Sequence, residues 1–269
     1  MTRQVDVGGI SIAYDVVGSG PLLLLLHGFT GDGTTMAGLA HSLSDLRTVL
    51  TPDLVGHGRS SSPHDIAHYR MSAVVEQLVA VVAAEGNEPA DVIGYSLGGR
   101  VALSLALEQP SSVRSVTTVG ASPGLQGEER AARIADDEAL ATAIERDGVP
   151  AFVDRWMALP MWRSLQARIG ANAWAASREQ RLRGSAVGLA NSLRGLGTGA
   201  MPPMTDRLDT LRVPIHLIAG AEDVKFADMA QRMAGHIDDA EVTLVAEAGH
   251  AAHLEQPERV VDAVRRFLR

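Results

Sequence analysis

Short apolar runs alternate with stretches of helical periodicity over the first 120 residues. Four almost wholly apolar runs, typical of strands buried on both faces of a sheet, lie at 22–26, 49–52, 91–94 and 116–120. Apolar residues recur at helical spacing between them, at 35–43, 71–85 and 99–108. Residues 4–17 instead alternate apolar and polar about a Gly8-Gly9 turn, which predicts an antiparallel hairpin. This alternation favours a mostly parallel sheet wrapped by helices.

The alternation stops after residue 124. From about 128 to 196 the chain is charged, rich in alanine and without a strand pattern. Strand patterns resume at 213–220 and 241–246, followed by helical patterns at 226–237 and 257–268. We therefore expect an α/β fold with a mostly parallel eight-stranded sheet flanked by helices. Residues 1–122 and 206–269 would form its core, and 123–205 a helical cap inserted between them.

Composition narrows the function class. The chain has 269 residues, 46% of them hydrophobic, which is enough for a sizeable core, and its formal net charge of −8 argues against nucleic-acid binding. The absence of cysteine excludes disulfides, thiolate metal sites and a cysteine nucleophile. No apolar stretch is long enough to span a bilayer, and the first residues carry no apolar signal-peptide core. We expect a cytoplasmic protein without a membrane partner, either a monomer or a homodimer.

The most specific motif is Gly94-Tyr95-Ser96-Leu97-Gly98, between a predicted strand and a predicted helix. A strand, a tight turn and a helix form the setting of a nucleophile elbow, where the serine backbone is strained and larger residues in place of the flanking glycines would collide with the turn. The helix that follows directs its free N–H groups at the reacting centre. Ser96 is therefore the predicted catalytic serine.

A catalytic serine needs a histidine to take its proton and a carboxylate to orient that histidine. Asp223 follows the strand pattern at 213–220, and His250 follows the one at 241–246. The order serine, aspartate, histidine is that of an α/β-hydrolase triad. His253 in place of His250, and Glu222 in place of Asp223, are the alternatives.

Other polar residues fit supporting roles. His27, His57 and Asp53 precede Ser96 in the chain and are expected to brace loops around the site. An oxyanion needs at least two donors, and the backbone N–H groups of Leu97 and Phe29 are the natural pair. The glycine-rich segment 28–33 lacks the Lys-Ser/Thr ending of a phosphate loop, and no set of residues has metal-ligand spacing. We expect neither a metal nor an organic cofactor.

Arg100 lies one helical turn after Ser96, on the same face of the predicted helix. Its guanidinium could hold a substrate carboxylate, or it could be a solvated surface arginine.

Four segments together resemble the α/β-hydrolase superfamily: LHGFTG (26–31), DLVGHGRS (53–60), GYSLGGR (94–100) and AGH (248–250). Four more segments make the resemblance narrower: ASPGL (121–125), SLRGLGTG (192–199), DVKF (223–226) and HAAHLE (250–255). These are similar to the 2-succinyl-6-hydroxy-2,4-cyclohexadiene-1-carboxylate synthases of menaquinone biosynthesis. Proline is commonly found in this family where the chain has Val55, and residues 201–204 also depart from the family pattern.

The narrower resemblance implies a lyase that eliminates pyruvate from a cyclohexene polycarboxylate, with Ser96, Asp223 and His250 used for proton abstraction. It also implies substrate-binding roles for Tyr95, Arg100, Arg133, Trp156 and Arg183, although Arg130 is close enough to Arg133 to compete for that position. Without the resemblance, the sequence indicates only that Arg133 and Arg183 contribute to the solubility of the cap helices and that Trp156 packs in the cap core.

Two other functions remain open at this point. A hydrolase of a carboxylic ester or carbon–carbon bond would use the same three residues. A non-catalytic receptor or scaffold would be expected to have lost part of the triad, whereas all three members are present.

Overall fold

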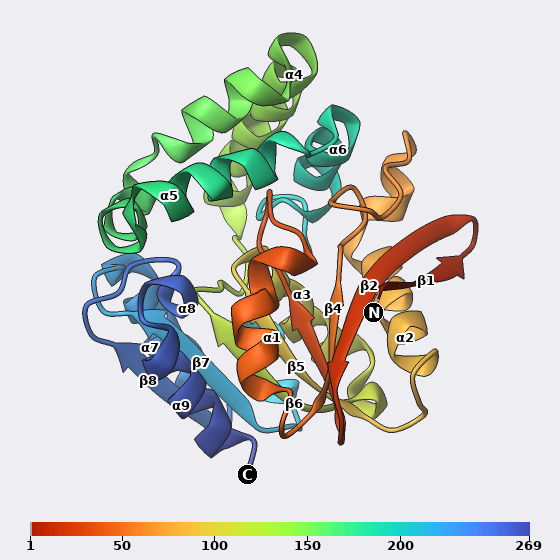
Figure 1. The fold of residues 1–269 in the computed structure, drawn as a ribbon, viewed down its shortest axis with the longest axis vertical. Helices are drawn as coiled ribbons and strands as arrows, with labels where there is room; N and C mark the ends of the chain where they lie inside the picture. Colours follow the sequence, from red (N-terminus) through yellow and green to blue (C-terminus); the bar gives the residue numbers. More distant parts are fainter. Residues whose placement is uncertain (1) are drawn as a thin grey trace.

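In the computed structural model, which describes residues 2–269, eight strands form one sheet in the order β1-β2-β4-β3-β5-β6-β7-β8 (Figure 1). β2 pairs antiparallel with β1 and β4, and all other neighbours are parallel. This confirms the predicted mostly parallel eight-stranded sheet. The strands are β1 (Thr2–Val7), β2 (Ile10–Gly18), β3 (Leu22–Leu26), β4 (Thr48–Pro52), β5 (Ala90–Tyr95), β6 (Val113–Val119), β7 (Ile215–Gly220) and β8 (Ala240–Val245).

The helices fill the connections between these strands. The α-helices are α1 (Ala37–Leu43), α2 (Met71–Ala83), α3 (Leu97–Glu108), α4 (Gly127–Met157), α5 (Arg163–Leu182), α6 (Ala186–Leu196), α7 (Val224–Ala234), α8 (Ala252–Glu255) and α9 (Pro257–Phe267). Single 3-10 turns lie at Gly33–Met36, Ile66–Tyr69, Pro110–Ser112, Pro160–Trp162 and Thr205–Thr210. The helix predicted from 99 begins two residues earlier, because the carbonyl of Ser96 already accepts a hydrogen bond from the Arg100 N–H.

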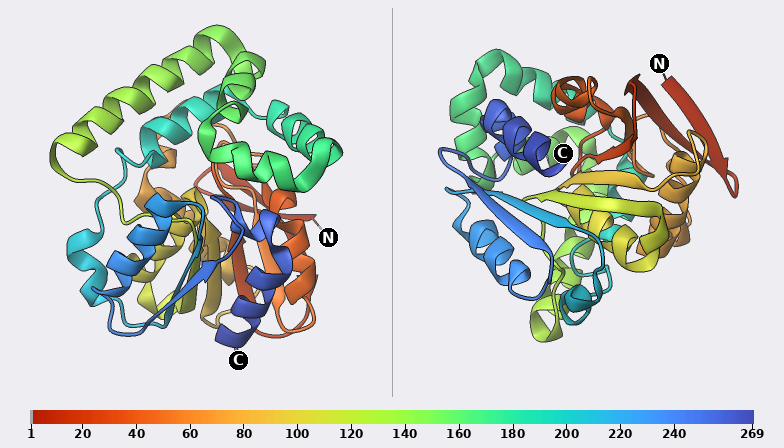
Figure 2. Two further views of the ribbon diagram at one scale, coloured as in Figure 1. Left: turned by 90° about the vertical axis from the view of Figure 1, so that its left-hand side faces the viewer. Right: turned by 90° about the horizontal axis from the view of Figure 1, so that it is seen from below.

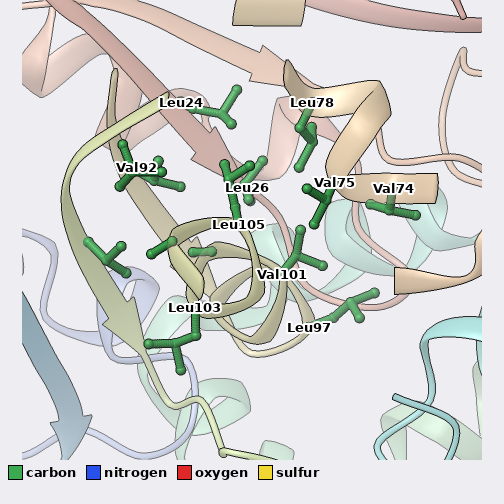
Figure 3. Packing of buried hydrophobic residues seen from close by; sticks show 14 of the residues in the cluster. Leu24, Leu26, Val74, Val75, Leu78, Val92, Leu97, Val101, Leu103 and Leu105 are labelled. Carbon is green, nitrogen blue, oxygen red and sulfur yellow. The ribbon is translucent and has the colours of Figure 1, made fainter. Parts of the chain in front are cut away.

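The central strands are buried on both faces, as their apolar runs predict. Along β3, Leu24 and Leu26 pack with residues of α2 and α3, whereas Leu23 and Leu25 pack with residues of α1 and α9. Successive side chains of a strand point to opposite faces, so a run of five leucines supplies both halves of the core. Figure 3 shows the first half, where Leu24 and Leu26 meet side chains of α2 and α3.

The cap consists of α4, α5 and α6, which lie above one end of the sheet (Figures 1 and 2). Among its described residues, the segment between β6 and β7 contains no strand. Gly148 and Gly170 adopt positive φ values of 82° and 78° and break α4 and α5 into shorter pieces. Domain limits at residues 122 and 205 stay a prediction.

The cap joins the core through close backbone contacts. Gly188 of α6 lies so near the Gly56 turn that a Cβ on Gly188 would come within 2.2 Å of the Gly56 carbonyl oxygen. A backbone atom cannot rotate away as a side chain can, so the glycine is required for this contact. No helix of residues 2–269 is long and apolar enough to cross a membrane.

We predict that Gly188→Ala lowers the free energy of unfolding by about 1–3 kcal/mol, the usual cost of forcing a methyl group into packed structure. Gly38→Ala is the matched control, because a Cβ at that exposed helical position meets nothing within 4 Å. The control should be neutral or stabilising by up to about 1 kcal/mol. Urea unfolding of the two variants measures the difference; equal stabilities would show that the cap does not depend on this contact.

Candidate active site

The elbow at Ser96 is built as the sequence predicts. Ser96 lies between β5 and α3 with φ 50° and ψ −105°, a conformation that is strained for a residue other than glycine. A Cβ on Gly94 would come within 2.2 Å of the Gly98 carbonyl oxygen, and one on Gly98 within 2.4 Å of the Leu26 carbonyl oxygen. Close approach of strand and helix therefore requires both glycines. The Ser96 N–H donates to the Val119 carbonyl at 2.9 Å, which fixes the turn.

Ser96, His250 and Asp223 lie within hydrogen-bonding distance in series. His250 Nε2 is 3.1 Å from Ser96 Oγ, and His250 Nδ1 is 2.8 Å from Asp223 Oδ2. A carboxylate only accepts, so Nδ1 carries the proton and Nε2 is free to accept one from the serine. Asp223 follows β7 and His250 follows β8, both at the sheet end where β5 delivers Ser96. The arrangement is that of a general base acting on a serine hydroxyl.

The two alternative residues lie elsewhere. The His253 ring packs 4.4 Å from the Tyr95 ring, and burial, reinforced by the nearby His250, lowers its pKa to about 3. Glu222 forms an ion pair with Arg168 of α5. Among the described residues, neither His253 nor Glu222 is hydrogen-bonded to Ser96 or His250, so the geometry favours His250 and Asp223.

The loop residues brace the site. His27 Nε2 accepts the Leu54 N–H at 3.0 Å, and its Nδ1 lies 2.8 Å from the Gly28 carbonyl oxygen. Asp53 accepts hydrogen bonds from the Gly33 N–H at 2.7 Å and the Arg59 N–H at 2.8 Å. These bonds tie the loops after β3 and β4 to each other.

The two predicted oxyanion donors are available. Within residues 2–269, the backbone N–H groups of Phe29 and Leu97 donate to no protein acceptor. Leu97 is the first residue of α3, where N–H groups have no partner inside the helix and the helix dipole is positive. Both residues line the cavity that contains Ser96.

That cavity has a volume of about 390 Å³ and lies between the sheet end and the cap. Three cationic side chains line it: Arg100, Arg133 and Lys225. Asp223 is the only carboxylate among its described lining residues, and it is hydrogen-bonded to His250. The walls are otherwise rich in apolar and aromatic side chains. Such a cavity suits a small molecule that carries several negative charges.

Arg100 is buried, with 8% of its surface exposed, and is not a solvated surface residue. Its Nη1 donates to the Leu196 carbonyl at 2.9 Å, and no carboxylate of the described chain forms an ion pair with it. Burial, with a smaller contribution from the charge of Arg133, lowers its pKa to about 10, so it remains charged at neutral pH. A buried guanidinium without a carboxylate partner is prepared to bind an anion.

The other predicted binding residues divide into two groups. Tyr95, Arg133 and Trp156 line the cavity with Arg100. Arg183 does not: its side chain is 62% exposed and lies 3.5 Å from Asp32, at a separate small cleft. The prediction that Arg183 reaches the site is therefore not supported, because its position at the end of α5 directs it to the Asp32 loop.

The two neighbouring cap arginines, Arg130 and Arg133, differ in where their side chains lie. Arg130 Nε donates to the Gly199 carbonyl at 2.9 Å, while Arg133 Nε donates to Asp137 at 2.7 Å and its side chain lines the cavity. Trp156 both packs and faces the cavity: its ring lies 5.4 Å from that of Phe29, and its Nε1 is buried without a hydrogen-bond partner among the described residues.

Lys225 and Phe226 are lining residues to which sequence reasoning assigned no role. Both belong to the selective segment DVKF, so the signal was present, but their direction depends on the first turn of α7. Among residues 2–269, no group of three or more histidine, aspartate or glutamate side chains is placed to hold a metal ion.

Comparison with known proteins identifies the family of the chain. A model of the alpha/beta hydrolase fold family matches residues 21–257. The chain therefore belongs to the α/β-hydrolase family.

Its relatives are more specific. The chain is 35% identical to a candidate 2-succinyl-6-hydroxy-2,4-cyclohexadiene-1-carboxylate synthase of Bacillus subtilis, over 96% of this chain and 95% of the relative. It is 31% identical to the synthase of that name from Klebsiella pneumoniae, over 92% and 94%. The structure of MenH from S. aureus superposes with a TM-score of 0.90 at 30% identity, covering 95% of this chain and 97% of that one. The predicted resemblance to these synthases is confirmed.

The buried histidines make stability depend on pH. His253 has a folded-state pKa near 3, whereas a histidine in an unfolded chain titrates near 6.5. Below pH 6.5 the unfolded chain binds a proton at His253 that the folded chain does not. The stabilising contribution of His253 to the free energy of unfolding is therefore fully present above pH 6.5 and is lost as pH falls towards 3. We predict that His253→Phe, which keeps a ring against Tyr95, reduces the pH dependence of unfolding by about 1.4 kcal/mol per pH unit between pH 5.5 and 4.5.

Urea unfolding of the wild type and His253→Phe at several pH values measures this slope. An unchanged slope would mean that His253 titrates alike in the folded and unfolded chains.

Proposed function

We propose that this protein eliminates pyruvate from 2-succinyl-5-enolpyruvyl-6-hydroxy-3-cyclohexene-1-carboxylate, a step of menaquinone biosynthesis. The observation that carries the proposal is the charge of the cavity: Arg100, Arg133 and Lys225 surround the same space as Ser96. The substrate has three carboxylates, on the ring, the succinyl arm and the enolpyruvyl group. The names of the relatives support the same reaction.

Ser96, His250 and Asp223 would supply the base. His250, oriented by Asp223 at 2.8 Å, draws the proton from the Ser96 hydroxyl at 3.1 Å. Ser96 Oγ then removes the ring hydrogen beside the succinyl carbonyl. General-base assistance of this kind contributes roughly 10²–10⁴-fold to a rate.

The electron pair of the broken C–H bond forms a new ring double bond, the existing double bond shifts by one position, and the C–O bond to the enolpyruvyl group breaks. Pyruvate leaves as its enolate, which takes up a proton. Negative charge develops on oxygen during these steps, and the Phe29 and Leu97 N–H groups would stabilise it. One such donor contributes on the order of 3 kcal/mol. The cationic side chains would hold the carboxylates in register, which provides the proximity gain.

A serine hydrolase that acts on an ester or carbon–carbon bond is the second candidate. It is favoured by the hydrogen-bonded series Ser96–His250–Asp223, which serves acyl transfer equally well. Such an enzyme would form an acyl-Ser96 intermediate and show burst kinetics with p-nitrophenyl acetate, whereas the lyase would be a feeble esterase.

Pyruvate release from the authentic substrate tests the proposal directly. We expect rapid release by the wild type, and a loss of about 10²–10⁴-fold in Ser96→Ala from removal of the base. Circular dichroism verifies that the variant is folded. Absence of pyruvate together with brisk turnover of p-nitrophenyl acetate would favour the hydrolase instead.

Arg100 gives a second test, because its charge is buried and unpaired by carboxylates. Arg100→Met should lower kcat/KM for the polycarboxylate about tenfold or more, as expected when a charge-assisted hydrogen bond worth roughly 1.5–3 kcal/mol is lost. Arg100→Lys should recover part of the loss. Arg212→Ala is the control: it removes the same charge from an exposed arginine that does not line the cavity. If Arg100→Met and Arg212→Ala behave alike, Arg100 does not bind substrate.

A further inference from the structure

A buried carboxylate holds the loop that carries the catalytic histidine. The Glu255 side chain is 0% exposed, and it accepts the Gly249 N–H at 2.9 Å and the Ala251 N–H at 3.3 Å. These are the residues on either side of His250. The position of the imidazole therefore depends on Glu255 remaining where it is.

The partner of Glu255 comes from the cap. Arg168 of α5 donates from Nη1 to Glu255 at 3.0 Å and from Nη2 to Glu222, the residue before Asp223. One guanidinium thus joins the loop that carries His250 to the loop that carries Asp223. Arg168 also lines a second surface cavity, which shares His250 and Asp223 with the substrate cavity.

Glu255 has no second cation available to replace Arg168. Among the described residues, Arg168 is the only lysine, arginine or histidine within 4.0 Å of its carboxylate. An ionised carboxylate at 0% exposure is costly unless it is paired and hydrogen-bonded, and removing one partner of such a pair leaves the other charge uncompensated. Without Arg168, the Glu255 carboxylate is expected to turn towards water, which weakens its hydrogen bonds to the two N–H groups.

The cap also contacts the loop that carries His250 directly. A Cβ on Gly249 would lie 2.1 Å from Ser164 Oγ, in the first turn of α5. Helix α5 therefore contacts the loop through the Ser164 side chain as well as through the ion pair.

We propose that Arg168 is a positioning residue, which aligns His250 with Asp223 and Ser96 by pairing with Glu255 and Glu222 from the cap. The proposal rests on the role of the triad in the proposed function, but not on the identity of the substrate. It makes the catalytic alignment conditional on the cap being seated on the core.

Two measurements separate this role from a merely structural one. Arg168→Met keeps the aliphatic stem and removes the charge. Its rate of covalent labelling of Ser96 by a fluorophosphonate, in which Ser96 Oγ attacks phosphorus and fluoride leaves, should fall about tenfold or more if alignment costs about 1.4 kcal/mol or more. Pyruvate release should show the same loss in kcat with little change in KM, because Arg168 does not line the substrate cavity.

Rescue by the conservative variant supplies a second signature. Arg168→Lys can pair with only one carboxylate at a time and should recover part of the rate. Glu222→Gln removes only the ion pair between Arg168 and Glu222 and should cause a smaller loss of labelling rate.

The matched control is Arg178→Met on the same helix. Arg178 pairs with Asp154 and Glu179, both within the cap, and touches neither triad loop. It should label at the wild-type rate. A wild-type labelling rate in Arg168→Met would overturn the proposal, even if the melting temperature of the variant falls.

If Arg168→Met does not fold, the same comparison is made with Arg168→Lys and Glu222→Gln. Wild-type labelling rates in both variants would then overturn the proposal. The labelling assay also separates the two hypotheses: a wild type that labels rapidly but releases no pyruvate contradicts the lyase, and leaves the effect of Arg168 on labelling fully measurable.

Discussion

The close approach of α3 to the ends of β5 and β3 is the constraint on which the rest of the site depends. Gly94 and Gly98 allow backbone contacts that any side chain would block, and these contacts hold Ser96 at a positive φ. This backbone conformation of Ser96 costs about 1–3 kcal/mol, and packing of the core on both faces of the sheet must offset that cost. In return the hydroxyl stands clear at the sheet end, beside the free N–H of Leu97. The geometry of nucleophile and oxyanion site thus follows from one packing requirement.

The substrate cavity is lined by positive charges although the molecule as a whole is negatively charged. The chain carries a net charge of −8, yet three cations face the substrate cavity and its one carboxylate is hydrogen-bonded to His250. Arg100 bears the desolvation cost of burial, which is reflected in its lowered pKa. A cost of this kind is consistent with a site that binds an anion, because the ligand then completes a pair that the protein leaves open. A neutral ester would gain nothing from it.

The sequence patterns predicted those features of the structure that depend on residues close together in the chain. The five leucines of β3, the glycines of the elbow and the order of Ser96, Asp223 and His250 define fold and triad without any knowledge of distant contacts. The cap was harder, because the direction of a long side chain depends on how a helix is rotated and seated. Arg130 and Arg133 are three residues apart, but one binds backbone carbonyls and the other reaches the cavity. No periodicity distinguishes them, and none links Arg168 to Glu255, 87 residues away.

The cap is therefore more than a cover for the cavity. It supplies Arg133 and Trp156 to the wall of the substrate cavity, and it contacts the triad loops through the ion pairs of Arg168 with Glu222 and Glu255. Its attachment to the core relies on tight backbone contacts such as that of Gly188 with Gly56, which tolerate little displacement. A cap that moved as a rigid unit would disturb the cationic wall and the histidine loop together. The same motion would then affect both substrate binding and the alignment of His250 with Ser96. Deprotonation of Ser96 would therefore be limited when the cavity is open.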